Sequence, residues 1–183
     1  MAWLKTNLDG VWIFEPKIWN DDRGYFVETY NALNLPEELK DINFVQDNEA
    51  GSVRGVLRGL HYQLPPFGQS KLVRVIGGEV LDVIVDLRPE SSTFKQYLTI
   101  ILNDITKKQL FVPKGFAHGY VVLSEEATFA YKCDMYYSPE YEAGIRYDDE
   151  DLDINWILPH DACFVSSKDK KLPYFKDHKT YKL

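Results

Sequence analysis

Cysteine is scarce in this 183-residue chain, which contains only Cys133 and Cys163. The two residues are far apart and show no metal-ligand spacing, so we expect neither a disulfide framework nor a zinc site. Long apolar runs are also absent, both near Met1 and further along the chain. The sequence therefore predicts a soluble, cytoplasmic protein with no signal peptide and no membrane partner.

Positively charged residues are also fewer than negatively charged ones. The chain carries 21 Lys and Arg residues against 28 Asp and Glu residues, which gives a formal net charge of -7. Lysines gather only at residues 168–171. Because nucleic-acid binding needs a basic surface, we expect no nucleic-acid partner. An anionic ligand would have to be held by a few local cations.

The composition and the turn pattern favour a β-rich protein. Apolar residues make up 45% of the chain and aromatic residues 14%, and glycine, aspartate, asparagine and proline mark turns at short intervals. The apolar stretches between these turns are too short for most helices, which predicts an all-β sandwich or barrel. The length suits one domain that spans residues 1–183.

The clearest strand signal is a pair of apolar stretches, residues 72–76 and 80–87, separated by two glycines. This arrangement predicts a β-hairpin. In the second stretch apolar residues alternate with a mixed set that includes Asp82 and Asp86. We therefore expect a strand with one apolar face and one mixed face.

Weaker signals complete the predicted fold. Further strands are expected at residues 11–14, 26–30, 96–102, 109–112, 119–123 and 128–136. Residues 31–40 have room for one or two helical turns, and beyond residue 138 recurring prolines predict short helices and extended segments that wrap the sheet. Polar side chains on the mixed strand faces should point into a cavity or towards a partner subunit; they are Arg74, Tyr131 and Cys133.

Two of the four histidines, His61 and His118, have glycine neighbours that permit a ligand to approach the backbone closely. Both are therefore candidate site residues. Alternatively, either histidine caps a strand or packs half-buried at a sheet edge. A metal-binding β-barrel of this size would have His-x-His, but Gln63 follows His61 at that spacing, so metal ligation is disfavoured.

Three further residues have an ordinary structural explanation when taken singly. Lys71 could be a strand-end lysine with its ammonium group in water. Tyr131 could be a large aromatic residue on a sheet. Asp169 lies three residues after Ser166 in a pattern that fits a helix capping box.

Taken together, the same residues indicate a reaction. A histidine base, an orienting aspartate, a lysine cation and a tyrosine acid are the groups needed to remove a proton beside a carbonyl and return it to the other face. That reaction is an epimerisation. Arg23 and Arg58 could hold phosphates through paired N–H groups, although either could simply form a surface ion pair.

An ordered series of motifs resembles the dTDP-4-dehydrorhamnose 3,5-epimerase family over nearly the whole chain. These motifs are DRGYFVE at 22–28, VQDN at 45–48, RGVLRGLHYQ at 54–63, QSKLV at 69–73, GEVLDV at 78–83, VDLR at 85–88, STF at 92–94, GFAHG at 115–119, YK at 131–132 and SKD at 167–169. The resemblance implies a cupin-type jelly-roll β-barrel with short C-terminal helices.

The resemblance also implies roles for the candidate residues. His61 would be the general base in a dyad with Asp169, Tyr131 the general acid, and Lys71 the cation that stabilises the enolate oxygen at C4. His118 would line the sugar pocket. The residues implied in binding the nucleotide and diphosphate are Arg23, Glu28, Gln46, Asn48 and Arg58, with Glu142 and Lys168 nearby.

The family further implies a dTDP-4-keto-6-deoxy sugar as substrate, no metal and no redox cofactor. Its members are homodimers in which the N-terminal strand of one subunit joins the sheet of the other, so Arg23 would serve the partner's site. The sequence departs from the family pattern at Ile157, where a proline commonly follows the tryptophan, and at residues 146–150, which lack a common proline. Both positions lie away from the proposed base and acid.

Three alternatives remain open at this stage. A relative that inverts only C3 of a related dTDP-4-keto-6-deoxy sugar would share the same four catalytic residues. A non-catalytic sugar-nucleotide-binding barrel would keep the pocket without the reaction. A metal-dependent cupin oxygenase or isomerase would require metal-dependent turnover.

Overall fold

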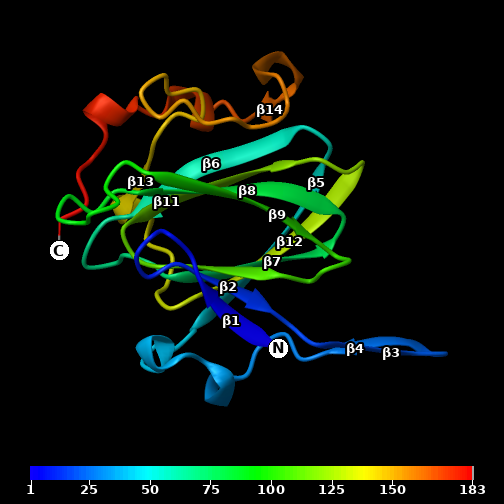
Figure 1. Ribbon diagram of the computed structural model, residues 1–183. Coiled ribbons are helices and arrows are strands. Elements are labelled where there is room, and N and C mark those ends of the chain that lie inside the picture. Colours follow the sequence, from blue (N-terminus) through cyan, green and yellow to red (C-terminus); the bar gives the residue numbers. More distant parts are fainter. Residues whose placement is uncertain (183) are drawn as a thin grey trace.

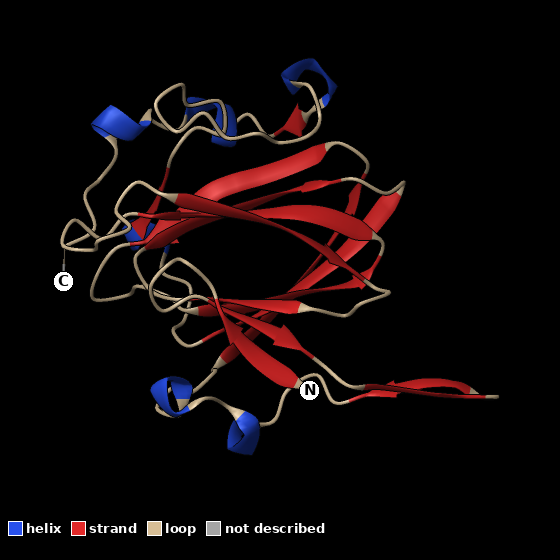
Figure 2. Cartoon of the chain, viewed as in Figure 1, coloured by secondary structure: helices blue, strands red, loops and turns tan. Residues whose placement is uncertain are grey.

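Two facing β-sheets form the body of the molecule, for which a computed structural model describes residues 1–182 (Figure 1, Figure 2). The first sheet contains, in spatial order, β1 (Ala2–Lys5), β2 (Trp12–Glu15), β10 (Gln109–Val112), β7 (Lys71–Gly77), β12 (Glu126–Cys133) and β5 (Gln46–Val53). The second contains β13 (Glu142–Gly144), β6 (Val56–Gln63), β11 (Phe116–Val122), β8 (Glu79–Asp86) and β9 (Tyr97–Asn103). The predicted all-β jelly-roll barrel is confirmed.

Three short strands lie outside these two series. β3 (Ile18–Asp21) and β4 (Gly24–Val27) form a separate hairpin that projects from the barrel (Figure 1), and β14 (Phe164–Val165) runs parallel to the start of β6. The strand expected at residues 26–30 thus begins earlier and ends at Val27.

Within residues 1–182 helical structure is limited to single 3-10 turns. They are η1 (Ala32–Asn34), η2 (Glu37–Leu39), η3 (Pro139–Tyr141), η4 (His160–Ala162), η5 (Asp169–Lys171) and η6 (Phe175–Asp177). The turns expected within residues 31–40 are confirmed, whereas the expected C-terminal helices are only three residues long. Across residues 1–182 none of the helices has the length and apolar character needed to cross a membrane. The cytoplasmic location stays a prediction.

The hairpin predicted across the two central glycines is wrong. β7 pairs with β10 and β12 in the first sheet, whereas β8 pairs with β9 and β11 in the second. The glycine turn therefore carries the chain from one sheet to the other. Gly78 has a φ of 79°, and a Cβ there would lie 2.1 Å from the Glu126 carbonyl oxygen, so this corner requires glycine.

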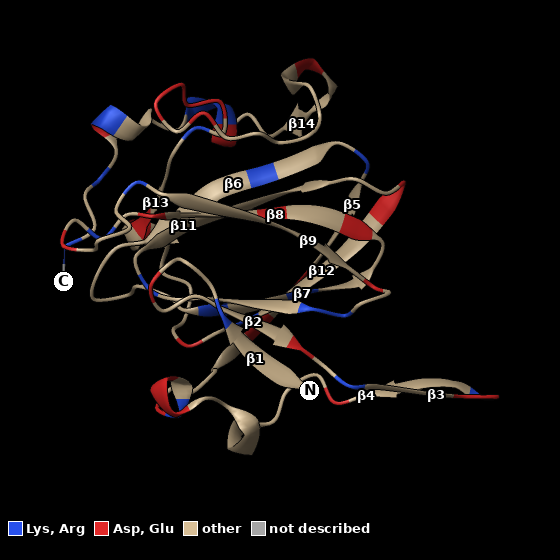
Figure 3. Ribbon diagram, in the orientation of Figure 1, with Lys and Arg blue, Asp and Glu red and all other residues tan. Residues whose placement is uncertain are grey.

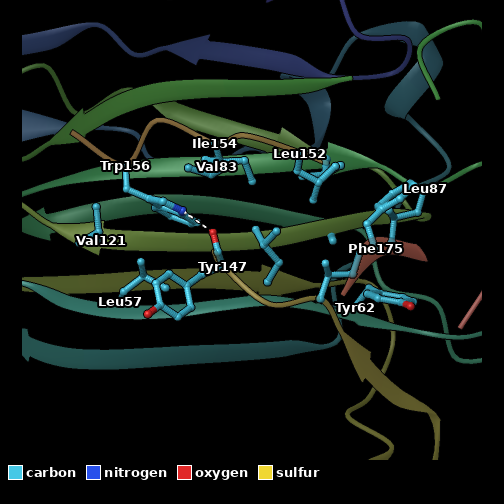
Figure 4. Packing of buried hydrophobic residues seen from close by; sticks show 14 of the residues in the cluster. Leu57, Tyr62, Val83, Leu87, Val121, Tyr147, Leu152, Ile154, Trp156 and Phe175 are labelled. Atoms are coloured by element: carbon cyan, nitrogen blue, oxygen red, sulfur yellow. Dashed lines mark hydrogen bonds between the residues drawn. The ribbon is translucent and has the colours of Figure 1, made fainter. Parts of the chain in front are cut away.

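The outer face of the second sheet is covered by the part of the chain that follows β13, from Ile145 to Tyr181 (Figure 1). Apolar residues of β6, β8 and β11 pack there against Tyr147, Leu152, Ile154 and Trp156 (Figure 4). The Trp156 indole N–H donates a hydrogen bond of 2.8 Å to the Tyr147 carbonyl oxygen. This packing fixes the segment that later supplies Asp169 to the interior.

The backbone at Ile157 is incompatible with the proline that the resemblance leads one to expect there. Its φ is 67°, a left-handed conformation, whereas the proline ring fixes φ near −65°. A proline would therefore not fit the backbone after Trp156. The departure from the family pattern agrees with the local geometry.

Two further apolar clusters stabilise the barrel. One fills the interior between the sheets, and the other packs η1 and η2 against the outer face of the first sheet. Interior side chains of β8 alternate as expected, since Ile84 joins the apolar interior and the fully buried Asp82 stands beside it. Acidic and basic residues are scattered along the ribbon in Figure 3. The one-domain prediction for residues 1–183 includes Leu183, which lies outside the described residues.

Candidate active site

A pocket of about 500 Å³ opens between the two sheets. Its size falls in the range of small-molecule sites. Seven of the residues singled out in the sequence line it together, from β6, β7, β11, β12 and the start of η5; they are Arg58, His61, Lys71, His118, Tyr131, Lys168 and Asp169. The barrel thus gathers side chains that are up to 111 positions apart, from Arg58 to Asp169.

His61 and Asp169 form the predicted dyad. The His61 Nε2 atom lies 2.9 Å from Asp169 Oδ1, and the Gly59 backbone N–H donates to the other carboxylate oxygen at 3.3 Å. Burial alone would raise the pKa of Asp169, but these hydrogen bonds hold it below its ordinary value of 3.8. The carboxylate therefore stays ionised and can stabilise a positively charged His61.

The capping-box interpretation of Asp169 is half right. Ser166 Oγ accepts a hydrogen bond of 3.0 Å from the Asp169 backbone N–H, as a capping residue does. The Asp169 side chain does not return the bond, because it points to His61. Ser166 stabilises the turn, and the carboxylate of Asp169 remains available to bind His61.

Lys71 and Tyr131 lie on the first sheet, facing His61 on the second. The Lys71 Nζ atom is 5.9 Å from the centre of the Tyr131 ring. Burial lowers the pKa of Lys71, and the nearby acidic side chains of Asp82 and Glu142 oppose this only in part. Burial raises the pKa of Tyr131 to about 12, so its hydroxyl keeps its proton at neutral pH. A cation and a proton donor thus stand opposite His61.

His118 has its own carboxylate partner. Its Nε2 atom lies 2.9 Å from Asp82 Oδ2, and both side chains are buried. No motif or spacing identified Asp82 as a site residue, although its place on the mixed face of β8 is unusual for a charged side chain. In the folded chain it fixes the ring of His118 at the pocket wall.

Polar residues at the edge of the site are linked to one another. Lys168 Nζ donates to Glu142 Oε2 at 2.6 Å, and the Tyr137 hydroxyl donates to the same oxygen at 2.8 Å. Burial alone would raise the pKa of Glu142, but these two bonds hold it below its ordinary value. Glu142 does not itself line the pocket, and it reaches the site through Lys168.

Gln46 and Asn48 lie on edge strand β5, beside β12, which carries Tyr131. Asn48 is paired in register with Tyr131, and the Gln46 amide donates to Asn48 Oδ1 at 3.0 Å. Gln46 also accepts a hydrogen bond from the Tyr137 backbone N–H. Neither residue lines the main pocket, but both lie next to it.

Two predicted residues lie away from the pocket of their own chain. Arg23 stands at the tip of the β3–β4 hairpin, where it pairs with Asp21 and keeps 89% of its side chain exposed. Glu28 follows β4 and accepts hydrogen bonds from Asn31 and Asn34. Within one chain these two residues do not contribute to the site.

Several pocket residues had no signal in the sequence. The aromatic residues Tyr120, Phe129 and Phe164 line the pocket, and a tyrosine or phenylalanine on a strand is indistinguishable from a core residue until the two sheets are paired. Within residues 1–182 no group of three or more His, Cys, Asp and Glu side chains is arranged to hold a metal ion.

Comparison with known proteins gives one consistent family. A family model described as dTDP-4-dehydrorhamnose 3,5-epimerase matches residues 5–177. The dTDP-4-dehydrorhamnose 3,5-epimerase of Methanothermobacter thermautotrophicus is 46% identical over 179 residues, which cover 97% of this chain and 96% of that protein. The enzyme of the same name from Salmonella typhimurium is 48% identical, with 94% of each chain covered.

Solved structures agree with these sequence matches. The crystal structure of dTDP-4-dehydrorhamnose 3,5-epimerase from Elizabethkingia anophelis has a TM-score of 0.92 and 48% identity, with 99% of each chain covered. A dTDP-6-deoxy-D-glucose-3,5-epimerase from Legionella pneumophila, solved in complex with dTDP-4-keto-L-rhamnose, has a TM-score of 0.91 and 44% identity. The match covers 100% of this chain and 99% of the Legionella pneumophila chain.

Proposed function

This chain belongs to the dTDP-4-dehydrorhamnose 3,5-epimerase family, and from that premise we propose that its pocket residues divide the reaction between the two walls of the barrel. The observation that carries the proposal is the dyad of His61 and Asp169 on one wall, facing Lys71 and Tyr131 on the other. A base and an acid on opposite sides of one pocket are what an inversion needs.

The enzyme inverts C3 and C5 of dTDP-4-dehydro-6-deoxy-D-glucose and gives dTDP-4-dehydro-L-rhamnose. Both carbons are adjacent to the 4-keto group, which makes their hydrogens acidic. Removing either proton moves the electron pair of the C–H bond towards the C4 oxygen and forms an enolate. One base and one acid can therefore serve both carbons in turn.

His61 takes the proton from carbon in our proposal. With Asp169 accepting the Nε2 proton, the lone pair of the neutral ring resides on Nδ1, the basic nitrogen. Once the ring is charged, the carboxylate of Asp169 stabilises it. A positioned base of this kind contributes about 10² to 10⁴ in rate.

Lys71 and Tyr131 complete the step. The ammonium group of Lys71 stabilises the negative oxygen at C4, an effect on the order of 10² to 10³ in rate. Tyr131 delivers its hydroxyl proton to the face of the carbon opposite His61, so the configuration is inverted. Exchange with solvent then returns a proton to Tyr131 and removes one from His61.

The nucleotide part of the substrate requires cations and amide groups beside this centre. Arg58 and Lys168 line the pocket, and Gln46 and Asn48 stand on the adjacent edge strand. We assign them, with Glu142 as the partner of Lys168, to binding of the nucleotide and its diphosphate.

We further propose that Arg23 and Glu28 act in the pocket of a second copy, in a homodimer. Support comes from the β3–β4 hairpin, whose large side chains Trp19, Tyr25 and Phe26 are 41%, 59% and 68% exposed. A projecting apolar hairpin is typical of a segment that packs on a partner. β5 is at the edge of the first sheet, so its outer side is open to an added strand.

Turnover in deuterated water tests the proposed roles. With dTDP-4-dehydro-6-deoxy-D-glucose as substrate, deuterium should appear at both C3 and C5, and His61→Ala should abolish the exchange while dTDP still binds. Exchange that survives in His61→Ala would exclude this residue as the base. Label at C3 alone would instead indicate the C3-only reaction named for a 34% identical relative from Streptomyces niveus.

A further inference from the structure

Arg58 is a pocket cation whose charge is not neutralised by a nearby carboxylate. Across residues 1–182 no carboxylate oxygen lies within 4.0 Å of its guanidinium nitrogens. Instead, its Nε and Nη2 atoms both donate to Ser52 Oγ, at 3.3 and 3.2 Å. Because one hydroxyl accepts from two adjacent N–H groups, the remaining N–H groups of Arg58 are left for a ligand.

The contact between Arg58 and Ser52 joins the two sheets. Arg58 is on β6 in the second sheet, and Ser52 is on β5 in the first. Ala50, two residues before Ser52 on the same face of β5, lines the same pocket as Arg58. Ser52 thus holds the guanidinium group across the pocket.

Tyr120 stands next to this contact with an unused hydroxyl. It is the register partner of Arg58 on β11, and its ring stacks on Phe129 with 4.2 Å between ring centres. The residue is only 5% exposed, and its hydroxyl is buried with no hydrogen-bond partner among the described residues. Burial raises the pKa of the phenol, while the nearby Ser52 and Arg58 side chains act in the opposite direction.

We propose that Ser52 and Tyr120 are positioning residues that hold Arg58 ready for the substrate diphosphate. Ser52 accepts from two of the guanidinium N–H groups and keeps its own proton to donate, and the buried Tyr120 hydroxyl lies within interaction range of both Ser52 and Arg58. The inference rests on the proposed function, since it assigns the diphosphate to Arg58. A preoriented arginine loses less rotamer freedom when the ligand binds, so affinity rises.

Removing the Tyr120 hydroxyl should change stability and binding in a way that distinguishes the proposed role from a purely structural one. A buried hydroxyl without a partner costs stability in the free protein. Tyr120→Phe should therefore keep or raise the melting temperature and yet weaken diphosphate binding. A hydroxyl that only supported the fold would lower the melting temperature when removed.

Binding of dTDP and of thymidine separates the diphosphate from the nucleoside. Ser52→Ala and Tyr120→Phe should each weaken dTDP binding by about three- to tenfold, the effect of one hydrogen bond, and leave thymidine binding unchanged in NMR titrations. In turnover, KM should rise while kcat stays within about twofold. Ser52→Thr, which keeps a hydroxyl, should restore binding in part.

Matched controls and a double-mutant cycle complete the test. Ser92→Ala, at an exposed loop position, and Tyr97→Phe, whose hydroxyl bonds to the Asp153 carbonyl oxygen, should leave dTDP affinity unchanged. In an Arg58→Ala background, Ser52→Ala should cost nothing further, because its effect passes through Arg58.

Three results would overturn the inference. These are an equal loss of thymidine and dTDP binding, an undiminished Ser52→Ala effect in the Arg58→Ala background, or unchanged dTDP affinity in both single variants. The proposed function fails separately, if the wild-type protein does not incorporate deuterium from solvent. A protein that exchanges normally but shows unchanged dTDP affinity in the variants would refute the positioning role alone.

Discussion

The carboxylate of Asp169 bridges the side chain of His61 and the backbone N–H of Gly59, with one oxygen on each. The two oxygens fix the plane of the carboxylate and, through it, the orientation of the histidine ring. His61, the proposed base, is therefore positioned by a residue 108 positions further along the chain.

Asp169→Asn should lower kcat by about 10² to 10⁴ with little change in the fold, because an amide of the same shape cannot stabilise the charged histidine and favours the wrong tautomer. Steady-state kinetics and circular dichroism would measure the two effects. Asp151→Asn, an exposed position, is the matched control. Activity within tenfold of wild type in Asp169→Asn would argue against the dyad.

Tyr131→Phe should separate exchange from inversion. His61 can still remove the proton and return a solvent deuteron to the same face, so deuterium should enter the substrate without a change of configuration. Epimerised product should fall by about 10² to 10⁴. NMR of the recovered sugar would report both label and configuration, with Tyr174→Phe as an exposed control. Loss of exchange together with inversion would show that Tyr131 acts before the proton is removed.

The strands were largely predictable from sequence, but their partners were not. The apolar stretches at residues 72–76 and 80–87 correctly indicate two strands, and residues 109–112 coincide with β10. A turn of two glycines is equally compatible with a hairpin and with a corner between sheets. β8 is buried along almost its whole length and β7 only in part, and neither pattern distinguishes a hairpin from a corner, so the packing of the whole barrel decides between them.

The candidate site shows the same division. Residue chemistry and the family motifs identified seven side chains that line one pocket. Neither could identify Ser52 or Tyr120, because a serine and a tyrosine on strands carry no distinctive spacing. Asp82 was visible as a charged residue in an apolar strand, yet its partner His118 is known only from the pairing of β8 with β11.

Activity should fall at alkaline pH as Lys71 loses its proton. Burial lowers the pKa of Lys71 below its ordinary 10.5, and the protonated form is the active one, so the rate is retained below the folded pKa and lost above it. Tyr131, with a pKa of about 12, keeps its proton through this range. The pH profile of kcat/KM should therefore have an alkaline limb below pH 10.5.

In Lys71→Arg the alkaline limb of the kcat/KM profile should move to higher pH, because the guanidinium group stays charged. The absolute rate can be lower in this variant without affecting the shift. An alkaline limb at the same pH in wild type and Lys71→Arg would assign the titration to another group.

Mixing two inactive variants should restore activity if Arg23 serves the partner's pocket. His61→Asn lacks the base and Arg23→Ala lacks the exposed arginine of the hairpin. A mixed dimer would contain one pocket with both groups, so random exchange of subunits should recover about a quarter of wild-type activity. Sedimentation would verify dimers in each preparation. No recovery after exchange of subunits would place Arg23 outside the partner's active site.

The approach of β6 to β11 at Gly59 and Gly119 sets the spacing of the two histidines. His61 and His118 are register partners, and the pairing shifts directly after His118, at Gly119. A Cβ on Gly119 would lie 2.7 Å from the Arg58 carbonyl oxygen and 3.2 Å from the Gly59 Cα atom. Both contacts are with backbone, which cannot swing aside as a flexible side chain does.

Gly119→Ala should therefore separate the two strands and cost about 1 to 3 kcal/mol of stability, the usual cost of overpacking. Because Arg58, His61 and His118 move with these strands, kcat and dTDP affinity should fall together. Gly77→Ala is the matched control, since a Cβ there has nothing within 4 Å. Thermal denaturation and kinetics on both variants would measure the contrast, and a Gly119→Ala enzyme of wild-type stability and activity would show that the two strands can separate freely.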